Sequence, residues 1–335
     1  MIRKTEFGLL DLFLQRRAAD PEKTLFQDMS APVPVQWSYE QIDRRTRLIA
    51  AAFHALAADP ARGPRVAIFS ENTVESAAAD LACLFYDILD TPLNTHFDQD
   101  VLAGIFDRLS IDIAVVDIKE RAEILERVRA RTARPFTIVT TDRAAATESD
   151  SVIFLGERCG RMSPAEAGQI LGRRRRRPGN EVATVMFTSG STGKPKGVSF
   201  SIYQLAAKRF ARAAALPAVG GDEVFLSFLP LYHTFGRYLE LLGTIFWGGT
   251  YVFPGNPSVE TLLALLPRIN PTGFISVPVR WAQLHERCLE LIDAAGPGAD
   301  PEALMRSVVG RRLRWGLSAA GYLDPKVFHF FERNG

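Results

Sequence analysis

Short apolar runs alternate with longer helical patterns along most of this chain. The apolar runs, which are predicted to be strands, occur at residues 66–69, 113–116, 136–139, 152–155, 182–187, 224–228, 251–253 and 274–277. Two of the helical patterns between them cover residues 73–89 and 121–130. A strand that is apolar along its whole length is typical of a parallel sheet covered on both faces. The alternation therefore predicts an α/β fold with two doubly wound sheets packed with helices.

The length of 335 residues suits about two domain-sized units. We expect one α/β subdomain over residues 62–200, and a second one over residues 1–61 and 201–335. Two further stretches, 173–180 and 293–302, have the composition of exposed loops.

Serine residues precede two of the predicted helices. Ser38 stands before a helix predicted at 39–58, and Ser201 stands before one predicted at 202–215. Serine is a favoured N-cap because its hydroxyl accepts a hydrogen bond from an otherwise unpaired backbone N–H of the first turn. A last helix is predicted at 325–333.

The charges of the chain are nearly balanced, with 40 Lys and Arg against 38 Asp and Glu and a formal net charge of +2. This balance excludes an acidic-tail protein and gives no support for a general nucleic-acid binder. Five consecutive arginines, Arg173 to Arg177, suit phosphates, RNA or anionic lipid, or they form a solvated loop. Without these five charges the rest of the chain carries −3, and sequence signatures of RRM and KH domains are absent, which favours the solvated loop.

The cysteines give no sign of a disulfide framework or a metal site. Cys83, Cys159 and Cys288 are far apart, and no pair has metal-ligand or redox spacing. The N-terminal stretch lacks an uninterrupted apolar core, and the apolar stretch 239–247 is too short to span a bilayer and contains Glu240. We therefore expect a soluble, cytoplasmic protein.

One segment combines glycines, hydroxyl side chains and lysines directly after the predicted strand 182–187. It reads Thr188-Ser189-Gly190-Ser191-Thr192-Gly193-Lys194-Pro195-Lys196-Gly197. Its three glycines allow backbone N–H groups to approach an anion closely, its hydroxyls add donors, and its two lysines offset the charge of a polyphosphate. The candidate phosphate-binding residues are Thr188, Ser189, Gly190, Ser191, Thr192, Gly193, Lys194 and Lys196.

This segment is not a Walker A loop. That motif requires Gly at the position of Thr188 and Ser or Thr at the position of Pro195, so a P-loop kinase or GTPase is disfavoured. The bland alternative is an ordinary flexible turn. The order of ten residues after a buried strand favours phosphate binding over that turn.

The segment resembles the phosphate-binding signature of the adenylate-forming (AMP-binding) superfamily, which includes acyl-CoA synthetases, peptide-synthetase adenylation domains and luciferases. Weaker motifs extend the resemblance over nearly all of the chain. Residues 37–43 resemble the family's early helix entry, and residues 81–94 resemble its second core motif, with Asp87 where a glycine is common. The resemblance implies the fold of an N-terminal adenylation domain.

Two further motifs resemble the branch that contains the long-chain fatty acid–CoA ligases. Residues 228–233 are similar to the motif that places an aromatic residue or His beside the acyl group, which here is His233. Residues 233–237, followed by Glu240, look most like this branch, as do residues 277–281. The resemblance implies that His233 and Phe235 bind the acyl substrate. The aromatic and aliphatic side chains that follow either wall an acyl tunnel or form ordinary core, namely Phe235, Tyr238, Leu241, Phe246 and Trp247.

Residues 317–323 resemble the small-residue segment against which the family packs adenine. The usual form has two glycines, an alanine and a proline, and Tyr322 stands here at the proline position. Small residues let a planar base lie close to the backbone, and a tyrosine ring can stack on it. The resemblance implies an adenine site at Ala320, Gly321 and Tyr322.

The function implied by the resemblance is ATP-dependent activation of a fatty acid, with long-chain acids favoured. ATP and Mg²⁺ would serve the formation of acyl-adenylate, and CoA would be the co-substrate that yields acyl-CoA. The implied partners are these small molecules and no nucleic acid, with peripheral membrane contact as a route to the lipid substrate.

The later motifs of the family would follow Gly335, so no catalytic or metal-binding residue is assigned. We expect residues 1–335 to be an N-terminal adenylation-domain portion that is truncated before the C-terminal lid domain and inactive by itself. Two other interpretations stay open. One is an adenylating enzyme that loads a carrier protein instead of CoA, and the other is a non-catalytic module that binds nucleotide or acyl groups.

Overall fold

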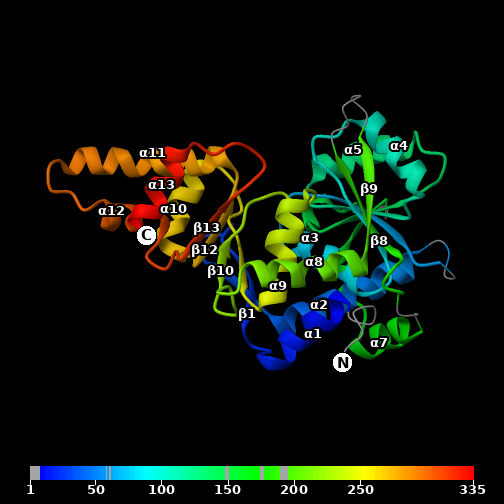
Figure 1. The fold of residues 1–335 in the computed structure, drawn as a ribbon. Coiled ribbons are helices and arrows are strands. Elements are labelled where there is room, and N and C mark those ends of the chain that lie inside the picture. Colours follow the sequence, from blue (N-terminus) through cyan, green and yellow to red (C-terminus); the bar gives the residue numbers. More distant parts are fainter. Residues whose placement is uncertain (1–7, 58, 60–61, 148–150, 174–176, 189–194) are drawn as a thin grey trace. The chain divides into compact units, whose positions relative to one another are not determined.

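The computed structural model describes residues 8–57, 59, 62–147, 151–173, 177–188 and 195–335 (Figure 1). The chain forms two compact units. The first comprises Met1–Lys23, Ser38–Ala215 and Pro230–Arg237, and the second comprises Thr24–Trp37, Leu216–Leu229 and Tyr238–Gly335.

The first unit is built around a seven-stranded sheet with the order β7-β6-β5-β3-β4-β8-β9. The strands are β3 (Arg65–Phe69), β4 (Leu89–Pro92), β5 (Ile113–Val116), β6 (Thr137–Thr140), β7 (Val152–Phe154), β8 (Val182–Thr188) and β9 (Lys196–Ser201). The helices are α1 (Leu9–Ala19), α2 (Tyr39–Leu56), α3 (Val74–Phe85), α4 (Gln99–Leu109), α5 (Lys119–Arg129), η1 (Arg143–Ala145), α6 (Leu155–Gly160), α7 (Pro164–Gly172) and α8 (Ile202–Ala215).

Both faces of this sheet are buried under helices. On β3, Ala67 and Phe69 pack in a cluster with residues of α4 and α5. Val66 and Ile68, on the opposite face, pack with residues of α2 and α3. Alternate residues of one strand therefore enter two different cores, as the period of two in a strand requires. This confirms the prediction of a doubly wound sheet for the first unit.

The predicted caps are present. The Ser38 hydroxyl accepts a hydrogen bond from the Gln41 backbone N–H at 3.2 Å, and the Ser38 backbone N–H donates to Gln41 Oε1 at 2.8 Å. At the start of α8, the Ser201 hydroxyl accepts from the Gln204 backbone N–H at 3.2 Å. The two reciprocal bonds between Ser38 and Gln41 form the capping box at the start of α2.

The expectation of purely parallel strands is wrong at one edge of the sheet. β8 and β9 pair antiparallel, with Thr188 opposite Lys196, whereas β8 pairs parallel with β4. Parallel neighbours need a crossover of a dozen or more residues, and only seven residues separate β8 from β9. β8 and β9 therefore form a hairpin.

The second unit contains a six-stranded sheet with the order β13-β12-β10-β11-β1-β2. The strands are β1 (Thr24–Asp28), β2 (Val35–Ser38), β10 (Val224–Leu226), β11 (Thr250–Phe253), β12 (Gly273–Ser276) and β13 (Trp315–Ser318). The helices are α9 (Leu242–Trp247), α10 (Val259–Ile269), α11 (Pro278–Ala295), α12 (Pro301–Val309) and α13 (Pro325–Asn334). A further helix, η2 (Phe235–Leu241), begins in the first unit and ends in the second.

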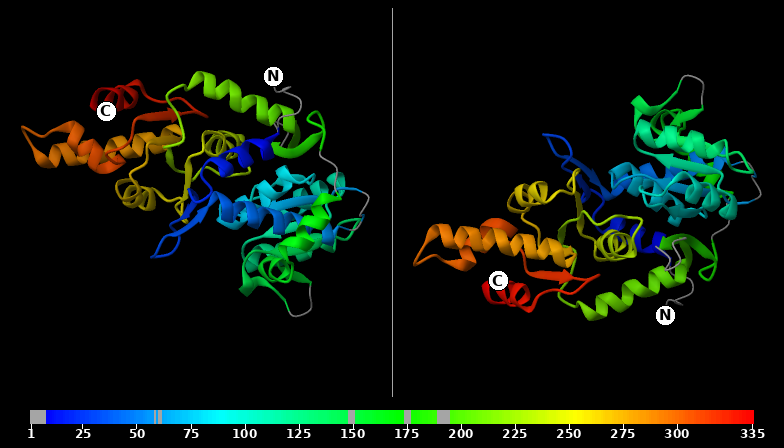
Figure 2. Two further views of the ribbon diagram at one scale, coloured as in Figure 1. Left: turned by 90° about the horizontal axis from the view of Figure 1, so that it is seen from below. Right: turned by 90° about the horizontal axis from the view of Figure 1, so that it is seen from above.

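Helices cover this second sheet as well. Figures 1 and 2 show α10 to α13 gathered together in yellow to red, and their apolar residues pack with Leu226 and Phe274 of the sheet. Trp247 of α9 packs on Phe225, with ring centroids 6.1 Å apart. Because Phe225 and Leu226 are successive residues of β10, they point to opposite faces, so both faces are covered at this strand.

The compact units and the expected subdomains divide the chain differently. The strands of the seven-stranded sheet lie within residues 65–201, and those of the six-stranded sheet within 24–38 and 224–318. The helices α1, α2 and α8, which we expected with the second subdomain, belong to the first compact unit.

Two of the expected loops need correction. The Arg177 side chain is only 8% exposed and its Nε donates to Asp87 Oδ1 at 3.1 Å, so Arg177 is not solvated. Asp87 has a φ of +57°, which explains why glycine is common there in the family that the sequence resembles. The loop expected at 293–302 is shorter, because α11 extends to Ala295 and α12 begins at Pro301.

The cysteines and the helices also bear on the class of protein. Cys83, Cys159 and Cys288 are buried free thiols. None of the helices in the described part of the chain combines the length and the apolar character that crossing a membrane requires.

The helix η2 is a π-helix that carries a buried carboxyl group. Glu240 is 1% exposed, and burial raises its pKa well above the ordinary value of 4.5, while the polar groups of the nearby Leu229 backbone and Ser227 side chain act in the opposite direction. Desolvation disfavours the charged form of a buried carboxyl group, so the folded chain retains the Glu240 proton to a higher pH than the unfolded chain does.

We predict that Glu240→Gln removes a pH-dependent loss of stability. Above about pH 4.5 the unfolded chain releases the Glu240 proton and the folded chain retains it, so wild-type stability falls as pH rises towards the folded pKa. The free energy of unfolding of the variant, relative to wild type, should increase by up to about 1.4 kcal/mol per pH unit in this window. Urea unfolding at pH 4 to 8, followed by circular dichroism, measures the difference.

The matched control is Glu260→Gln at the exposed start of α10. Hydrogen bonds from its own backbone N–H and from Ser258 lower the pKa of Glu260, so its stabilisation is lost only as pH falls. The control should therefore show a constant difference from wild type above about pH 6. An equally flat profile for Glu240→Gln would contradict the assignment of a raised pKa to Glu240.

Candidate functional site

The predicted phosphate-binding residues lie between β8 and β9. Ser189, Gly190, Ser191, Thr192, Gly193 and Lys194 fall outside the described residues. The two flanking residues are described: Thr188 ends β8, Lys196 begins β9, and both are exposed. They face each other across the hairpin, and the Thr188 hydroxyl lies 3.5 Å from the Lys196 carbonyl oxygen. The ends of the segment are thus held together by the antiparallel ladder.

The base of this hairpin is tightly packed. The Thr91 hydroxyl donates to the Val185 carbonyl oxygen at 2.6 Å, which ties β4 to β8 beyond their ladder. A Cβ at Gly197 would lie 3.1 Å from Val185 Cγ1 and 3.3 Å from the Phe187 ring, so a side chain at this position would press against its neighbours. The close approach explains why a glycine follows Lys196.

His233 lies on the segment that joins Leu229 to the π-helix η2, and Phe235 is the first residue of that helix. The His233 side chain is exposed, and its ring centroid lies 4.8 Å from that of Tyr232. Partial desolvation lowers the pKa of His233 below its ordinary value, so the imidazole is neutral at pH 7. The Phe235 side chain is half-buried. A neutral imidazole at the surface can contact an acyl group or donate one hydrogen bond.

The other side chains considered for an acyl tunnel pack as core. Tyr238 is 7% exposed, Leu241 is fully buried, and Trp247 packs on Phe225. Phe246 is half-buried. The burial of Tyr238, Leu241 and Trp247 is what ordinary core packing requires, and an acyl tunnel along these positions stays a prediction.

Three residues that were not expected from the sequence, Asn72, Asp80 and Asp90, hold the segment that carries His233. The Leu231 backbone N–H donates to Asn72 Oδ1 at 3.0 Å, and Arg237 contacts Asp80 and Asp90. Asp80 stands inside the otherwise apolar helix pattern of α3, and Asp90 stands in the short strand β4. A charged residue in a buried apolar pattern is the signal that could have found them, because such a charge needs a partner.

The segment predicted to contact adenine follows β13. Ala320 has a φ of +65°, in the left-handed region that favours glycine, which is the residue expected in this part of the motif. The Tyr322 side chain is 80% exposed. The described structure therefore places the Tyr322 ring in solvent rather than against a neighbouring side chain.

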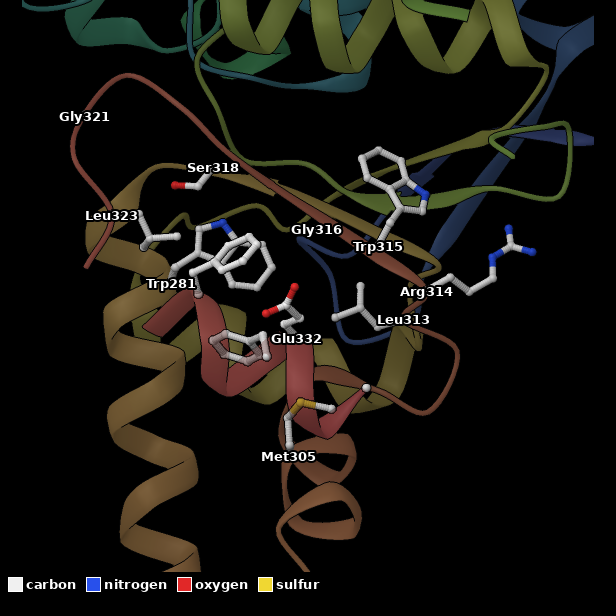
Figure 3. Close-up of a pocket in the computed structure, with 13 residues that line it drawn as sticks. Trp281, Met305, Leu313, Arg314, Trp315, Gly316, Ser318, Gly321, Leu323 and Glu332 are labelled. Carbon is white, nitrogen blue, oxygen red and sulfur yellow. The ribbon is translucent and has the colours of Figure 1, made fainter. Parts of the chain in front are cut away.

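A cavity of about 680 Å³ lies beside this segment in the second unit (Figure 3). Its lining residues are Trp281, Met305, Leu313, Arg314, Trp315, Gly316, Ser318, Gly321, Leu323, Phe328, Phe331, Glu332 and Gly335. The wall is largely apolar, and Figure 3 shows the Glu332 carboxylate among the apolar side chains while Arg314 extends away from them. Gly321 is the one predicted adenine residue that lines this cavity; Ala320 and Tyr322 do not.

The donor set suits an anion rather than a bare metal ion. Hydroxyls, backbone N–H groups and lysines of residues 188–196 can pair with phosphate oxygens. Within the residues that the structure describes, no three His, Cys, Asp or Glu side chains gather in a way that could hold a metal ion.

Comparison with curated proteins finds acid–thiol ligases and a reductase. The chain is 27% identical over 265 residues to long-chain-fatty-acid–CoA ligase 1 of Homo sapiens. The aligned region covers 76% of this chain and 37% of the ligase. It is 24% identical over 298 residues to carboxylic acid reductase of Mycobacterium tuberculosis. Here the aligned region covers 83% of this chain and 25% of the reductase. The chain thus spans well under half the length of either relative.

Solved structures share the fold. The adenylation domain of a carboxylate reductase from Mycobacterium chelonae matches 97% of this chain and 56% of that domain, with a TM-score of 0.79 and 20% identity. ATP-bound MatB from Rhodopseudomonas palustris matches 98% of this chain and 58% of its own, with a TM-score of 0.75 and 20% identity. The model of the AMP-binding enzyme family matches residues 13–335, nearly the whole chain, and the protein therefore belongs to the AMP-binding enzyme family.

Proposed function

We propose that this chain takes part in the ATP-dependent activation of a long-chain fatty acid to acyl-adenylate and then to acyl-CoA. The observation that carries the proposal is the Ser-, Thr-, Gly- and Lys-rich segment whose flanking residues, Thr188 and Lys196, are paired in a hairpin. The family match and the similarity to fatty-acid ligases support it.

In the proposed reaction, a carboxylate oxygen attacks the α-phosphate of ATP and pyrophosphate leaves. The part assigned to this chain is to hold the β- and γ-phosphates with the backbone N–H groups and lysines of residues 188–196. Donors already in place stabilise the charge that develops on the leaving group without reorganisation. Mg²⁺, when bound with the nucleotide, supplies further neutralisation of phosphate charge. CoA then displaces AMP from the acyl group through its thiol.

The acyl group is proposed to lie beside His233 and Phe235. A neutral imidazole does not pair with the attacking carboxylate as a cation would, so the carboxylate keeps its nucleophilicity, and the half-buried Phe235 ring adds apolar surface. Ala320, Gly321 and Tyr322, in the second unit, stay a prediction for adenine.

A carrier-protein thiol is the second candidate acceptor. The chain is similar to a carboxylic acid reductase and to the adenylation domain of a carboxylate reductase. Neither of these relatives is named as a CoA ligase, which supports considering an acceptor other than CoA. Product analysis with CoA and with a phosphopantetheinylated carrier protein separates the two acceptors.

We predict that Lys196→Ala weakens the binding of Mg-ATP. A charge-assisted contact to a phosphate contributes about 1.5–3 kcal/mol, which corresponds to a roughly 10- to 100-fold higher Kd. Isothermal titration of the 335-residue chain with Mg-ATP measures the change. Lys208→Ala, an exposed lysine of α8, is the matched control and should leave Kd unchanged. Equal affinities for the two variants would overturn the phosphate-loop assignment.

We predict that affinity for saturated fatty acids rises with chain length and then reaches a plateau. Each methylene that becomes buried contributes up to about 0.8 kcal/mol, or about a fourfold change in Kd. Displacement of a fluorescent fatty acid by acids of increasing length measures the series. Benzoate and leucine serve as controls for aryl and amino acids, and a flat series or tighter binding of either control would reject the fatty-acid assignment.

A further inference from the structure

The segment Pro230–Arg237 belongs to the first unit although the residues on both sides of it belong to the second. Its path is fixed at two points. Near its start, the Leu231 backbone N–H donates to Asn72 Oδ1 at 3.0 Å. At its end, the Arg237 side chain is completely buried. His233 and Phe235, the residues assigned to the acyl group, lie between these two anchors.

The Arg237 guanidinium joins three other elements of the first unit. Its Nε donates to Asp80 Oδ2 on α3 at 2.9 Å, and its Nη2 donates to the other oxygen of Asp80 and to Asp90 on β4. Its Nη1 donates to the Thr184 hydroxyl on β8 at 2.6 Å. Because the guanidinium is a rigid planar fork, these bonds fix the position and the orientation of its end of the segment.

The electrostatics of this cluster require the partners to stay together. Asp80, Asp90 and Thr184 are all buried, and the side chain of Arg237 has no exposed surface. Burial raises the pKa of Asp90 well above its ordinary value, the charge of Arg237 opposes this, and the nearby Asp80 adds to it. Separating Arg237 from this site would strand an unpaired charge in the interior, which is strongly unfavourable.

A cluster of this kind is a poor way to gain stability alone, because well-packed apolar residues of similar volume do as well or better. It is an effective way to specify one arrangement of a segment. Thr184 lies on β8, four residues before Thr188, where the phosphate-binding segment begins. Arg237 therefore ties the segment that carries His233 to the strand that carries the phosphate-binding residues, within one unit.

We propose that Arg237 is a positioning residue that sets the place of His233 and Phe235 relative to the end of β8, and thereby the affinity for the acyl substrate. The part of this proposal that concerns acyl affinity rests on the function proposed above. β8 is also held by its ladders with β4 and β9, so loss of Arg237 should release the segment and leave the phosphate-binding end of β8 in place.

The test uses two variants of the 335-residue chain. The triple variant R237M/D80N/D90N removes all charges of the cluster together, so no unpaired charge is left in the interior. R237K keeps a cation, but a lysine cannot bond Asp80, Asp90 and Thr184 at the same time. If the triple variant does not fold, R237K is the variant that is compared with wild type. The matched control is R45M/E75Q, which removes the Arg45–Glu75 pair between α2 and α3.

Hydrogen–deuterium exchange of the peptide containing residues 230–237 is the first readout. Exchange should become at least about tenfold faster in the triple variant, and less so in R237K, while β3 and β5 keep their protection. The control should leave exchange of this peptide unchanged. Unchanged exchange in both Arg237 variants would overturn the proposal, whatever the chain binds.

The binding of ligands is the second readout. The Kd for a long-chain fatty acid should rise by about tenfold or more in the triple variant, with partial recovery in R237K. The Kd for Mg-ATP should change by less than about twofold, since distant sites behave independently. A parallel loss of both ligands would indicate a merely structural role and would contradict the proposal. Absence of fatty-acid binding in wild type would refute the proposed function, and exchange would still decide the role of Arg237.

Discussion

Burial of both faces of the seven-stranded sheet is the constraint on which the first unit depends. Ala67 and Phe69 of β3 enter one core, and Val66 and Ile68 enter the other. A shift of the strand by one residue would exchange these two sets of side chains, so the register is strongly specified. β8 pairs with β4 in the same sheet, and the phosphate-binding segment begins where β8 ends. The position of the candidate site is thus a consequence of core packing.

Buried charge is the second organising feature, and two clusters handle it differently. In the interior of the first unit, the Arg237 cation forms ion pairs with Asp80 and Asp90. Glu240, three residues later, has a raised pKa because burial disfavours its charged form. Both solutions avoid an isolated charge in a medium of low polarity.

Much of the fold could be predicted because its signals are local. The strand at 113–116 matches β5, and Ser38 caps α2 as predicted, since an apolar run and a capping hydroxyl act within a few residues. The direction of β9 and the burial of Arg177 could not be predicted in this way. The partner of Arg177 is distant in sequence, since Asp87 lies 90 residues away, whereas residues 196–201 were not predicted to be a strand. The phosphate-binding residues 189–194 stay a prediction from sequence.

By itself, the sequence determined the doubly wound α/β class and the resemblance to adenylate-forming enzymes, and it predicted a phosphate-binding segment after the strand at 182–187. These follow from periodicity and from the chemistry of neighbouring residues. Only the tertiary structure decided that Thr188 faces Lys196 across a hairpin and that Arg237 meets Asp80, Asp90 and Thr184 in the interior. The reason is physical: a buried charge selects its partners by distance in space, and residues that are 53 to 157 positions apart in sequence become neighbours only when the sheet and its helices have packed.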